Sequence, residues 1–218
     1  MIEAINPYTA KIIITAKDND SIRAISKRIN ASYAWTHQWV EKLVGLGIIA
    51  RRGQKIKINK KNIIYKEFTR FIKKALEESL SLADAYSLPN LAGLEYAYTE
   101  TDAVFIWTKG GYNIGRDKTA YPIFIEVVKE DISKWADFFD GISIKCTARI
   151  ERKKGIYFIL IAKKAIEKEE VNGVSVIPLN RTVEYAKKYI YNFEPALEML
   201  DSMYKLDTGI KYAEKGVR

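Results

Sequence analysis

Residues 39–58 read WVEKLVGLGIIARRGQKIKI, and this stretch decides the fold of the N-terminal part of the chain. It begins inside a segment of helical periodicity that ends at Gly47, a residue suited to the left-handed turn after a helix. Two isoleucines then lead into a basic tip that contains Gly53, after which lysine and isoleucine alternate over residues 55–58. Such alternation is typical of a strand with one buried face. The stretch therefore predicts a helix that leads directly into a basic β-hairpin.

The segments on the N-terminal side of that hairpin predict three helices. The first covers residues 7–16, and the second covers residues 21–29 with Asp20 or Ser21 as its N-cap. After a three-residue turn, the third helix covers residues 33–46. Helix, short helix, tight turn, helix and basic hairpin is the order of a winged helix-turn-helix domain.

The phrase WVEKLVGLGIIARRGQKIKI also resembles the end of the recognition helix and the wing of winged-helix regulators of the MarR-like type. Its signature is a Leu, a Gly four residues later, two apolar residues and a basic hairpin. The resemblance covers about residues 7–60. It implies that the third helix and the hairpin bind double-stranded DNA.

The positive charge of the chain is concentrated in the same segment. Residues 1–61 contain 12 Lys and Arg residues and four Asp and Glu residues, a net charge of +8. The remaining 157 residues contain 24 basic and 23 acidic residues. A basic surface can serve solubility alone, but an excess clustered in so short a segment favours a polyanionic partner.

The residues expected to contact DNA lie on the second helix, the third helix and the hairpin. They are Arg23, Lys27, Arg28, Ser32, Tyr33, His37, Gln38, Lys42, Arg51, Arg52, Lys55 and Lys57. Gln38 carries the amide that reads adenine in the major groove, and the hairpin cations suit the phosphate backbone. His37 is more simply explained as an exposed polar residue than as a base reader, and Trp35 and Trp39 are interpreted as packing residues. A winged helix can also bind protein, so the fold alone does not fix the partner.

A helical stripe continues over residues 62–85, and the tetrapeptide SLPN at residues 87–90 is predicted to break it. The predicted organisation is a winged-helix domain at residues 1–61, a linker helix at 62–86 and an effector or interaction domain at 87–218. DNA sites with two-fold symmetry favour a homodimer.

The C-terminal part mixes strand-like and helical segments. Strands are predicted at residues 121–128, 142–148 and 156–162, helices at 132–139, 181–190 and 194–204, and a tight hairpin turn at Asn172-Gly173. The predicted fold class is therefore α+β, with an N-terminal winged helix-turn-helix, a linker helix and a C-terminal domain built on a mixed sheet.

A second resemblance lies in this part of the chain. The segments YTETDAVFIWT, YPIFIEV and NGVSVIPLNRTVEYAKKYI, with the closing helix FEPALEMLDSMY, resemble the C-terminal domain of AbiEi-type antitoxins and related archaeal regulators. The resemblance covers roughly residues 94–204. It implies an autorepressor of transcription that also opposes a partner toxin of the nucleotidyltransferase class.

No catalytic or metal-binding pattern is found in the sequence, so we expect neither an enzyme nor a cofactor or metal. One His and one Cys exclude the usual zinc clusters and catalytic triads. Gly110-Gly111 invites comparison with nucleotidyltransferases, but the acidic residues that follow, Asp117 and Glu126, lack the pairing that two-metal chemistry needs. The alternatives to a DNA-binding regulator are an enzyme of the nucleotidyltransferase or nuclease type targeted by the winged helix, and a protein-interaction adaptor.

The expected location is the cytoplasm, without membrane contact. No segment approaches the roughly 18 apolar residues that span a bilayer, and the N-terminus lacks the pattern of a secretory signal. Two Gln, one Cys and three Met fit a heat-adapted, archaeal or thermophilic source. An AT-rich genome would also raise the content of Lys, Ile and Tyr.

Overall fold

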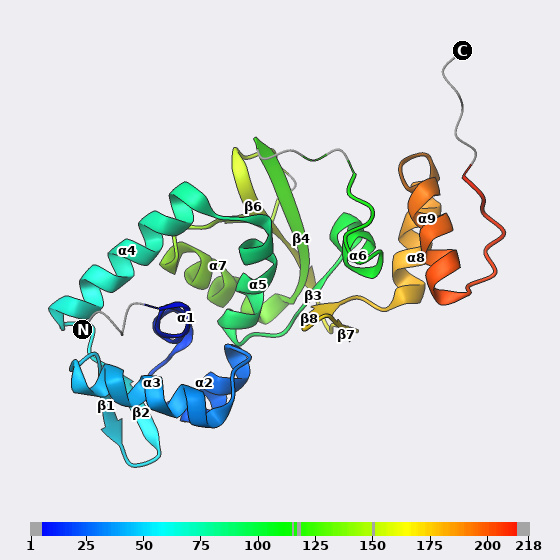
Figure 1. Cartoon of the computed structure of the whole chain (residues 1–218). Coiled ribbons are helices and arrows are strands. Elements are labelled where there is room, and N and C mark those ends of the chain that lie inside the picture. The colour runs from blue at the N-terminus through cyan, green and yellow to red at the C-terminus, as the bar shows by residue number, and fades with distance from the viewer. Residues whose placement is uncertain (1–5, 115, 117–118, 150, 213–218) are drawn as a thin grey trace. The chain divides into compact units, whose positions relative to one another are not determined.

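The fold of the chain is α+β, with helices, a two-stranded antiparallel sheet and a mixed six-stranded sheet (Figure 1). The computed structural model describes residues 6–114, 116, 119–149 and 151–212. None of the helices in these residues is both long enough and apolar enough to cross a membrane.

The chain divides into two compact units. The first unit comprises residues 1–94 and 137–144, and the second comprises residues 95–136 and 145–218. By its contacts the segment 62–86, expected as a separate linker, belongs to the first unit. The division into three domains stays a prediction.

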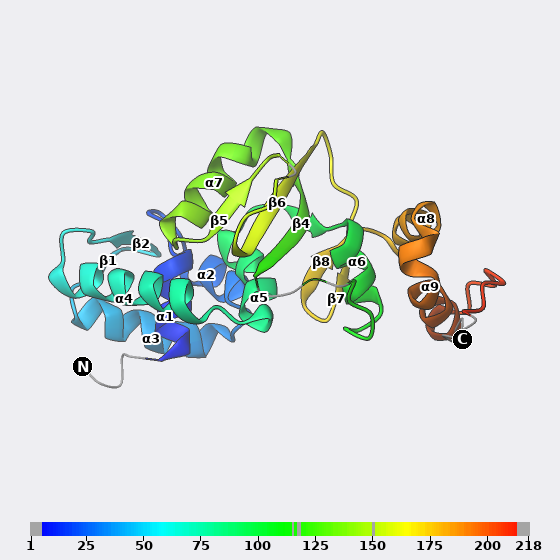
Figure 2. The same cartoon turned by 90° about the horizontal axis from the view of Figure 1, so that it is seen from above.

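Among its described residues up to 94, the first unit holds five helices and a hairpin. These elements are α1 (Pro7–Thr15), α2 (Ile22–Arg28), α3 (Tyr33–Gly45), β1 (Ile49–Arg52), β2 (Lys55–Ile58), α4 (Ile63–Ser79) and α5 (Leu82–Ala92). The helices and the hairpin predicted up to residue 58 are confirmed to within one or two residues. Figures 1 and 2 show α1, α2 and α3 packed together, with the hairpin following α3.

Helices α2 and α3 each begin at a serine cap. Ser21 Oγ accepts a hydrogen bond from the N–H of Ala24 at 3.2 Å, and Ser32 Oγ accepts one from Trp35 at 3.2 Å. Each serine thereby satisfies one backbone donor that a helix N-terminus leaves free. After α3, Gly47 adopts φ +69°, which turns the chain into β1.

The hairpin is fixed to the segment between α1 and α2. The N–H of Ile56 donates to the carbonyl of Asp20, and the N–H of Asn19 donates to the carbonyl of Ile56, both at 2.9 Å. The Asp18 carboxylate accepts a further bond from the N–H of Ile58 at 2.8 Å. Strand β2 thus has hydrogen-bond partners on both edges, and the hairpin is held against the helices.

The predicted helix at 62–85 is wrong as a single element, because it divides into α4 and α5 at Leu80. Ser81 caps α5 by accepting from the N–H of Asp84 at 3.1 Å and donating to the Asp84 carboxylate at 2.6 Å. The predicted break at residues 87–90 is also wrong, since α5 continues through Pro89 to Ala92. Gly93, with φ +61°, ends α5 instead.

The second unit is built on the six-stranded sheet. Beyond residue 94 the chain forms β3 (Tyr96–Tyr98), α6 (Glu100–Trp107), β4 (Ala120–Val128), a 3-10 turn (Lys129–Asp131), α7 (Ile132–Gly141), β5 (Lys145–Thr147), β6 (Gly155–Lys163), β7 (Glu169–Val171), β8 (Val174–Val176), α8 (Leu179–Lys188) and α9 (Ile190–Tyr204). The strand order is β5-β6-β4-β3-β8-β7. Parallel pairs join β5 to β6, β6 to β4 and β3 to β8, and the β3–β4 and β7–β8 pairs are antiparallel.

Most predicted elements of this part are confirmed, but α9 begins four residues before its predicted start at residue 194, and one strand is shorter than predicted. The strand predicted at 142–148 shrinks to β5, because Ser143 adopts φ +58° and interrupts the extended backbone. The N–H groups of Ile142 and Ile144 instead bond to the carbonyl of Phe139 and close the end of α7. The apolar run at residues 103–107 lies within α6.

Candidate nucleic-acid interface

Helix α3 has one buried face and one exposed face. Thr36, Val40 and Leu43 are buried in the first unit. Gln38 and Glu41 are exposed on the other side of the helix. The exposed face therefore carries an amide and a carboxylate, both of which can read base edges.

The register of the hairpin separates its cations into two groups. Arg52 pairs with Lys55, and Ala50 pairs with Lys57. Since directly opposed residues share a face of an antiparallel sheet, these three cations lie together on one face, and all three are exposed. We call Arg52, Lys55 and Lys57 the outer hairpin cations.

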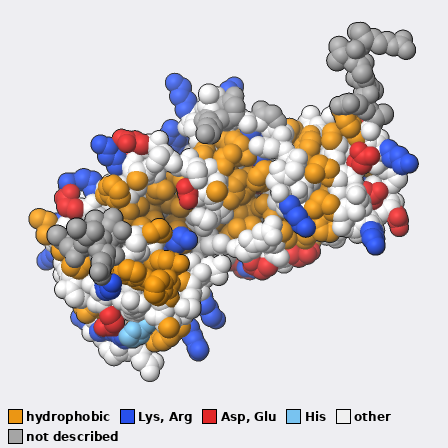
Figure 3. All heavy atoms as spheres, in the orientation of Figure 1, with side chains coloured by type: hydrophobic (Ala, Val, Ile, Leu, Met, Phe, Trp, Pro, Cys, Tyr) orange, Lys and Arg blue, Asp and Glu red, His pale blue; other side chains and the backbone are white. Residues whose placement is uncertain are grey.

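Arg51 lies on the opposite face of the hairpin, paired with the buried Ile56. Its Nε donates to Glu41 Oε1 of α3 at 2.8 Å, and its Nη2 lies 2.5 Å from the same oxygen. Arg51 Nη2 also lies 2.9 Å from His37 Nε2, which accepts when the imidazole proton is on Nδ1. Arg51 therefore joins the hairpin to α3. In Figure 3 the pale blue of a His side chain and the red of an acidic side chain lie next to each other.

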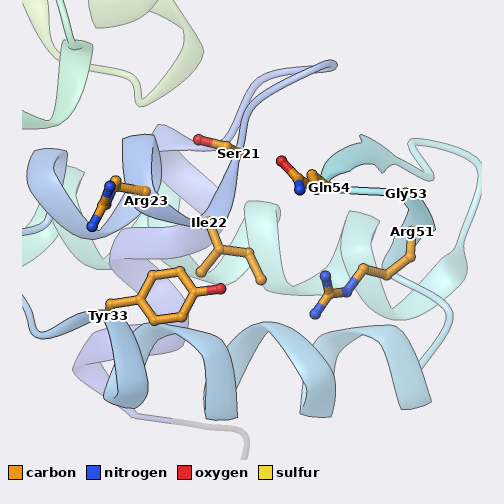
Figure 4. Close-up of a pocket in the computed structure, with 7 residues that line it drawn as sticks. All are labelled: Ser21, Ile22, Arg23, Tyr33, Arg51, Gly53 and Gln54. Atoms are coloured by element: carbon orange, nitrogen blue, oxygen red, sulfur yellow. The ribbon is translucent and has the colours of Figure 1, made fainter.

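A cavity of about 430 Å³ lies between the start of α2, the start of α3 and the hairpin. It is lined by Ser21, Ile22, Arg23, Tyr33, Arg51, Gly53 and Gln54 (Figure 4). Figure 4 shows the Tyr33 hydroxyl and the Arg51 guanidinium directed toward each other from opposite ends of the cavity. The cavity thus brings together predicted DNA-binding residues from α2, α3 and the hairpin.

The three cations of α2 do not share one environment. Arg23 and Lys27 are exposed. Arg28 donates to both carboxylate oxygens of Asp20, at 2.6 and 2.7 Å, and to the carbonyl of Thr15 at 3.0 Å. The guanidinium of Arg28 therefore forms its hydrogen bonds inside the first unit, which favours a structural role over the predicted contact with DNA.

The remaining predicted residues of α3 lie on its flanks. Ser32 acts as the N-cap, Tyr33 is exposed, and the ammonium of Lys42 lies 4.5 Å from the ring centroid of Trp39. Trp35 contacts Trp39 edge to face, with ring centroids 6.0 Å apart. The two tryptophans thus contact each other, and Trp35 stays partly exposed.

Sequence reasoning missed two features of this surface. Glu41 was not considered, although its position three residues after Gln38 places it on the same helical face. Lys60 and Lys61 follow β2 and are exposed. The run KINKKN contained the signal for both lysines.

The second unit contains a buried ionic network that the sequence did not reveal. Asp102 is completely buried and accepts from Arg116 Nη1 at 2.9 Å and from the N–H of Phe124 at 2.7 Å. Glu126 accepts from Arg181 at 2.7 and 3.2 Å and lies 3.5 Å from the ammonium of Lys163. Each buried acid is thus paired with cations from distant parts of the chain.

This network does not form a metal site. The described residues contain no group of three or more His, Cys, Asp or Glu side chains placed to hold a metal ion. Gly110, compared above with nucleotidyltransferase turns, has φ +81° and donates to the carbonyl of Phe105 at 2.8 Å. The Gly110-Gly111 pair therefore ends α6, and Asp117 lies outside the described residues.

Glu100 lies beside the buried acids and gives a pH-dependent prediction. Burial, together with the charges of Asp102 and Glu126, raises the pKa of Glu100 above its ordinary value of 4.5. The folded state thus binds the proton more tightly, and the stability contributed by Glu100 falls as pH rises through the raised pKa. Replacing Glu100 with Gln is expected to raise the melting temperature at pH 7. The gain is expected to shrink as pH falls through the raised pKa and to be largely gone at pH 4.5.

The matched control is Glu130→Gln, at an exposed position of the same unit. Glu100 has φ +53°, and Gln keeps that strained backbone, so the comparison isolates the charge. Thermal unfolding followed by circular dichroism from pH 4 to pH 8 measures both variants. A Glu100→Gln gain that does not depend on pH would contradict the electrostatic account.

Comparison of the chain with protein-family models, curated proteins and solved structures gives no match.

Proposed function

We propose that this protein is a sequence-specific DNA-binding regulator of transcription with a winged helix-turn-helix at its N-terminal end. The observation that carries the proposal is the arrangement of α2, a short turn and α3, followed directly by a hairpin with basic residues on its outer face. The net charge of +8 over residues 1–61 supports a polyanionic partner.

In the proposed complex, α3 enters the major groove, which is wide enough for a helix. Gln38 reads adenine through its amide, and Glu41 accepts from the exocyclic amine of cytosine. Arg51 holds the Glu41 carboxylate and thereby orients one base-reading group. In this assignment Arg51 is a positioning residue and not a phosphate contact.

The outer hairpin cations contact the phosphate backbone beside the groove, and Lys60 and Lys61 extend the same charge along the chain. Such contacts carry affinity but little sequence information. In this proposal, α3 provides the sequence specificity of binding and the hairpin provides most of the affinity.

The test is a titration of the full chain with fluorescent duplexes at several salt concentrations. One duplex carries the DNA upstream of the protein's own gene, and the other has a random sequence. We expect binding that weakens steeply with salt and prefers the upstream duplex. Absence of binding at low salt would overturn the proposal, and salt-dependent binding without preference would remove sequence specificity from it.

Gln38 gives a sharper prediction. Replacing Gln38 with Ala removes one bidentate base contact, which should reduce discrimination at one base pair by about 1–3 kcal/mol. Affinity for random DNA should stay unchanged, because no phosphate contact is lost. The measurement is competition with duplexes that vary one base pair at a time, with Gln54→Ala on the hairpin tip as the control. Loss of preference at no position would exclude Gln38 as a base reader.

A homodimer on a two-fold DNA site is part of the proposal. It is supported by α4, on which Ile63 and Phe71 are 74% and 64% exposed, so that no other described residue covers these two apolar side chains. Sedimentation at micromolar concentration is expected to give the mass of two chains. If the measured mass is that of one chain, both for the free protein and for the protein on DNA, the proposed dimer is wrong.

A protein partner is proposed for the second unit, as the likeness to AbiEi-type antitoxins implies. It is supported by the corner between α8 and α9, where Tyr189, Ile190 and Tyr191 are exposed, Tyr191 completely. Co-purification with a nucleotidyltransferase encoded beside this gene should require that corner. Unchanged binding by a Tyr189→Ala/Tyr191→Ala variant would exclude the corner.

A further inference from the structure

The loop between β5 and β6 concentrates positive charge inside an almost neutral part of the chain. Residues 145–155 contain five Lys and Arg residues and a single acid, Glu151, whereas the 157 residues after Lys61 carry 24 basic and 23 acidic residues. The whole loop belongs to the second unit. It therefore shares no residue with the surface assigned to DNA above.

The loop lies at the N-terminal ends of two parallel strands. Ala120 of β4 is opposite Gly155 of β6, and the N–H of Gly155 donates to the carbonyl of Thr119 at 2.9 Å. The ammonium of Lys145 donates to the carbonyl of Lys154 at 3.0 Å, which ties the end of the loop to β5. The cations are thus presented from a segment anchored to the sheet.

A cavity of about 670 Å³ opens at this position. It is lined by Thr119, Arg152, Lys153, Lys154 and Gly155. Gly155 has φ +79°, and a Cβ at that position would meet nothing within 4 Å, so the space before its backbone is open. The volume falls within the range of small-molecule sites, roughly 300–1,000 Å³.

The charges of the loop are only partly neutralised. Glu151 pairs with Lys153 at 2.8 Å. The hydrogen bonds from Lys153 and Thr147 lower the pKa of the Glu151 carboxyl, and the charge of Arg149 acts in the same direction. Arg152 and Lys154 are exposed, and no acid of the described residues forms an ion pair with either. Two cations at the cavity are therefore available to an anionic ligand.

We propose that this cavity is a second binding site of the protein, and that it takes phosphate groups. The guanidinium of Arg152 matches the geometry of phosphate oxygens, and Lys154 supplies a second positive charge beside it. The phosphate groups come either from the backbone of a nucleic acid or from a free nucleotide. The site does not depend on the proposed role of α3 and the hairpin.

The test compares two charge-matched double variants of the full chain. Arg152→Ala/Lys154→Ala removes the two cations of the cavity. Lys129→Ala/Lys187→Ala removes two exposed cations elsewhere in the same unit, Lys129 lying just beyond the other end of β4. Each protein is titrated with duplex DNA at several salt concentrations by fluorescence anisotropy, and with ATP by calorimetry.

If the ligand is a nucleic-acid backbone, the cavity variant should bind duplex DNA at least about tenfold more weakly than the control. The slope of log affinity against log salt should fall by about 1.8, since each phosphate contact contributes about 0.9. If the ligand is a free nucleotide, the wild type and the control should bind ATP, the cavity variant should not, and the DNA affinity of all three should agree.

The charge-conserving variant Arg152→Lys/Lys154→Arg should retain most of the affinity in either case, which separates loss of charge from disturbance of the loop. Equal affinities of the cavity variant and the control for both DNA and ATP would overturn the proposal. DNA binding that survives the loss of the hairpin cations but fails in the cavity variant would support this site and contradict the proposed role of the hairpin.

Discussion

Replacing Arg52, Lys55 and Lys57 together with Ala is expected to weaken binding to every duplex, specific or random, by roughly 100- to 1,000-fold at low salt. Each lost contact between an exposed cation and a phosphate is expected to cost about 1–1.4 kcal/mol net. Three contacts then cost about 3–4 kcal/mol, and about 1.4 kcal/mol corresponds to a factor of ten. The register of the hairpin places all three cations on one exposed face. They therefore act on one stretch of backbone, and their loss should be nearly additive.

The salt dependence of the affinity tests whether the outer hairpin cations contact phosphates. Loss of three phosphate contacts should reduce the slope of log affinity against log salt by about 2.7, while the ratio of specific to random affinity stays constant. The control removes three exposed cations from the polar face of α4, with Lys66, Arg70 and Lys74 changed to Ala. An equal loss in the control would mean that net charge, and not the hairpin, carries the binding.

Arg51→Ala should behave differently from the triple variant. Arg51 is held by Glu41 in the free protein, so its removal should disturb base preference more than the salt slope. The same titrations measure both quantities. A fall in slope of about one with unchanged preference would instead make Arg51 a phosphate contact.

Replacing Asp102 with Ala is expected to lower the free energy of unfolding of the second unit by about 3–5 kcal/mol, a large share of the roughly 5–15 kcal/mol that stabilises a typical domain. The Arg116 side chain is only 8% exposed and would keep its charge without this carboxylate. The N–H of Phe124 would also lose its acceptor. Both effects act on buried groups, for which water cannot substitute.

Urea unfolding followed by circular dichroism measures this cost. The control is Asp131→Ala, which removes an ion pair to Lys134 whose ammonium is well exposed, and it should cost no more than about 1 kcal/mol. A double-mutant cycle between Asp102 and Arg116 should show a coupling energy of about 1–3 kcal/mol. A loss below 1 kcal/mol for Asp102→Ala would mean that water reaches the pair.

The first unit could be predicted in detail because its signals are local. Ser21 and Ser32 cap the helices that follow them, and Gly47 supplies the left-handed turn before β1. Periodicity, caps and turn residues all act within a few positions of the sequence. The elements up to residue 58 were therefore found with nearly correct ends.

The break between α4 and α5 was missed because the apolar stripe continues across it. The signal was the pair Ser81 and Asp84, which form reciprocal hydrogen bonds at the start of α5. Pro89 does not break the helix. Its effect is local, whereas Leu88 and Leu91 on either side are buried and anchor the helix.

The residues of the candidate site could be proposed from the sequence, but their arrangement in space could not. Arg51 and Arg52 are adjacent in a strand and so lie on opposite faces, but only the pairing of β1 with β2 shows that Arg51 takes the face of the buried Ile56. Likewise, nothing near Arg28 in the sequence indicates that its partner is the carboxylate of Asp20. The ionic network of Asp102 and Glu126 joins residues 14 and 55 positions apart, a distance at which a single sequence gives no signal.

The side chains of the hairpin alternate between its two faces along each strand. A shift of one residue along a strand therefore moves the following side chains to the opposite face. Inserting one uncharged residue between Ile49 and Arg51 would turn Arg51 outward and send the next arginine toward Glu41. One phosphate contact would be lost, although the charged residues of the hairpin stay the same. Inserting two residues would restore the pattern. Insertions at the tip, at Gly53 and Gln54, lie outside the paired residues and would not change the charge pattern. In related chains we therefore expect insertions of any length at the tip, but only of an even number of residues within β1.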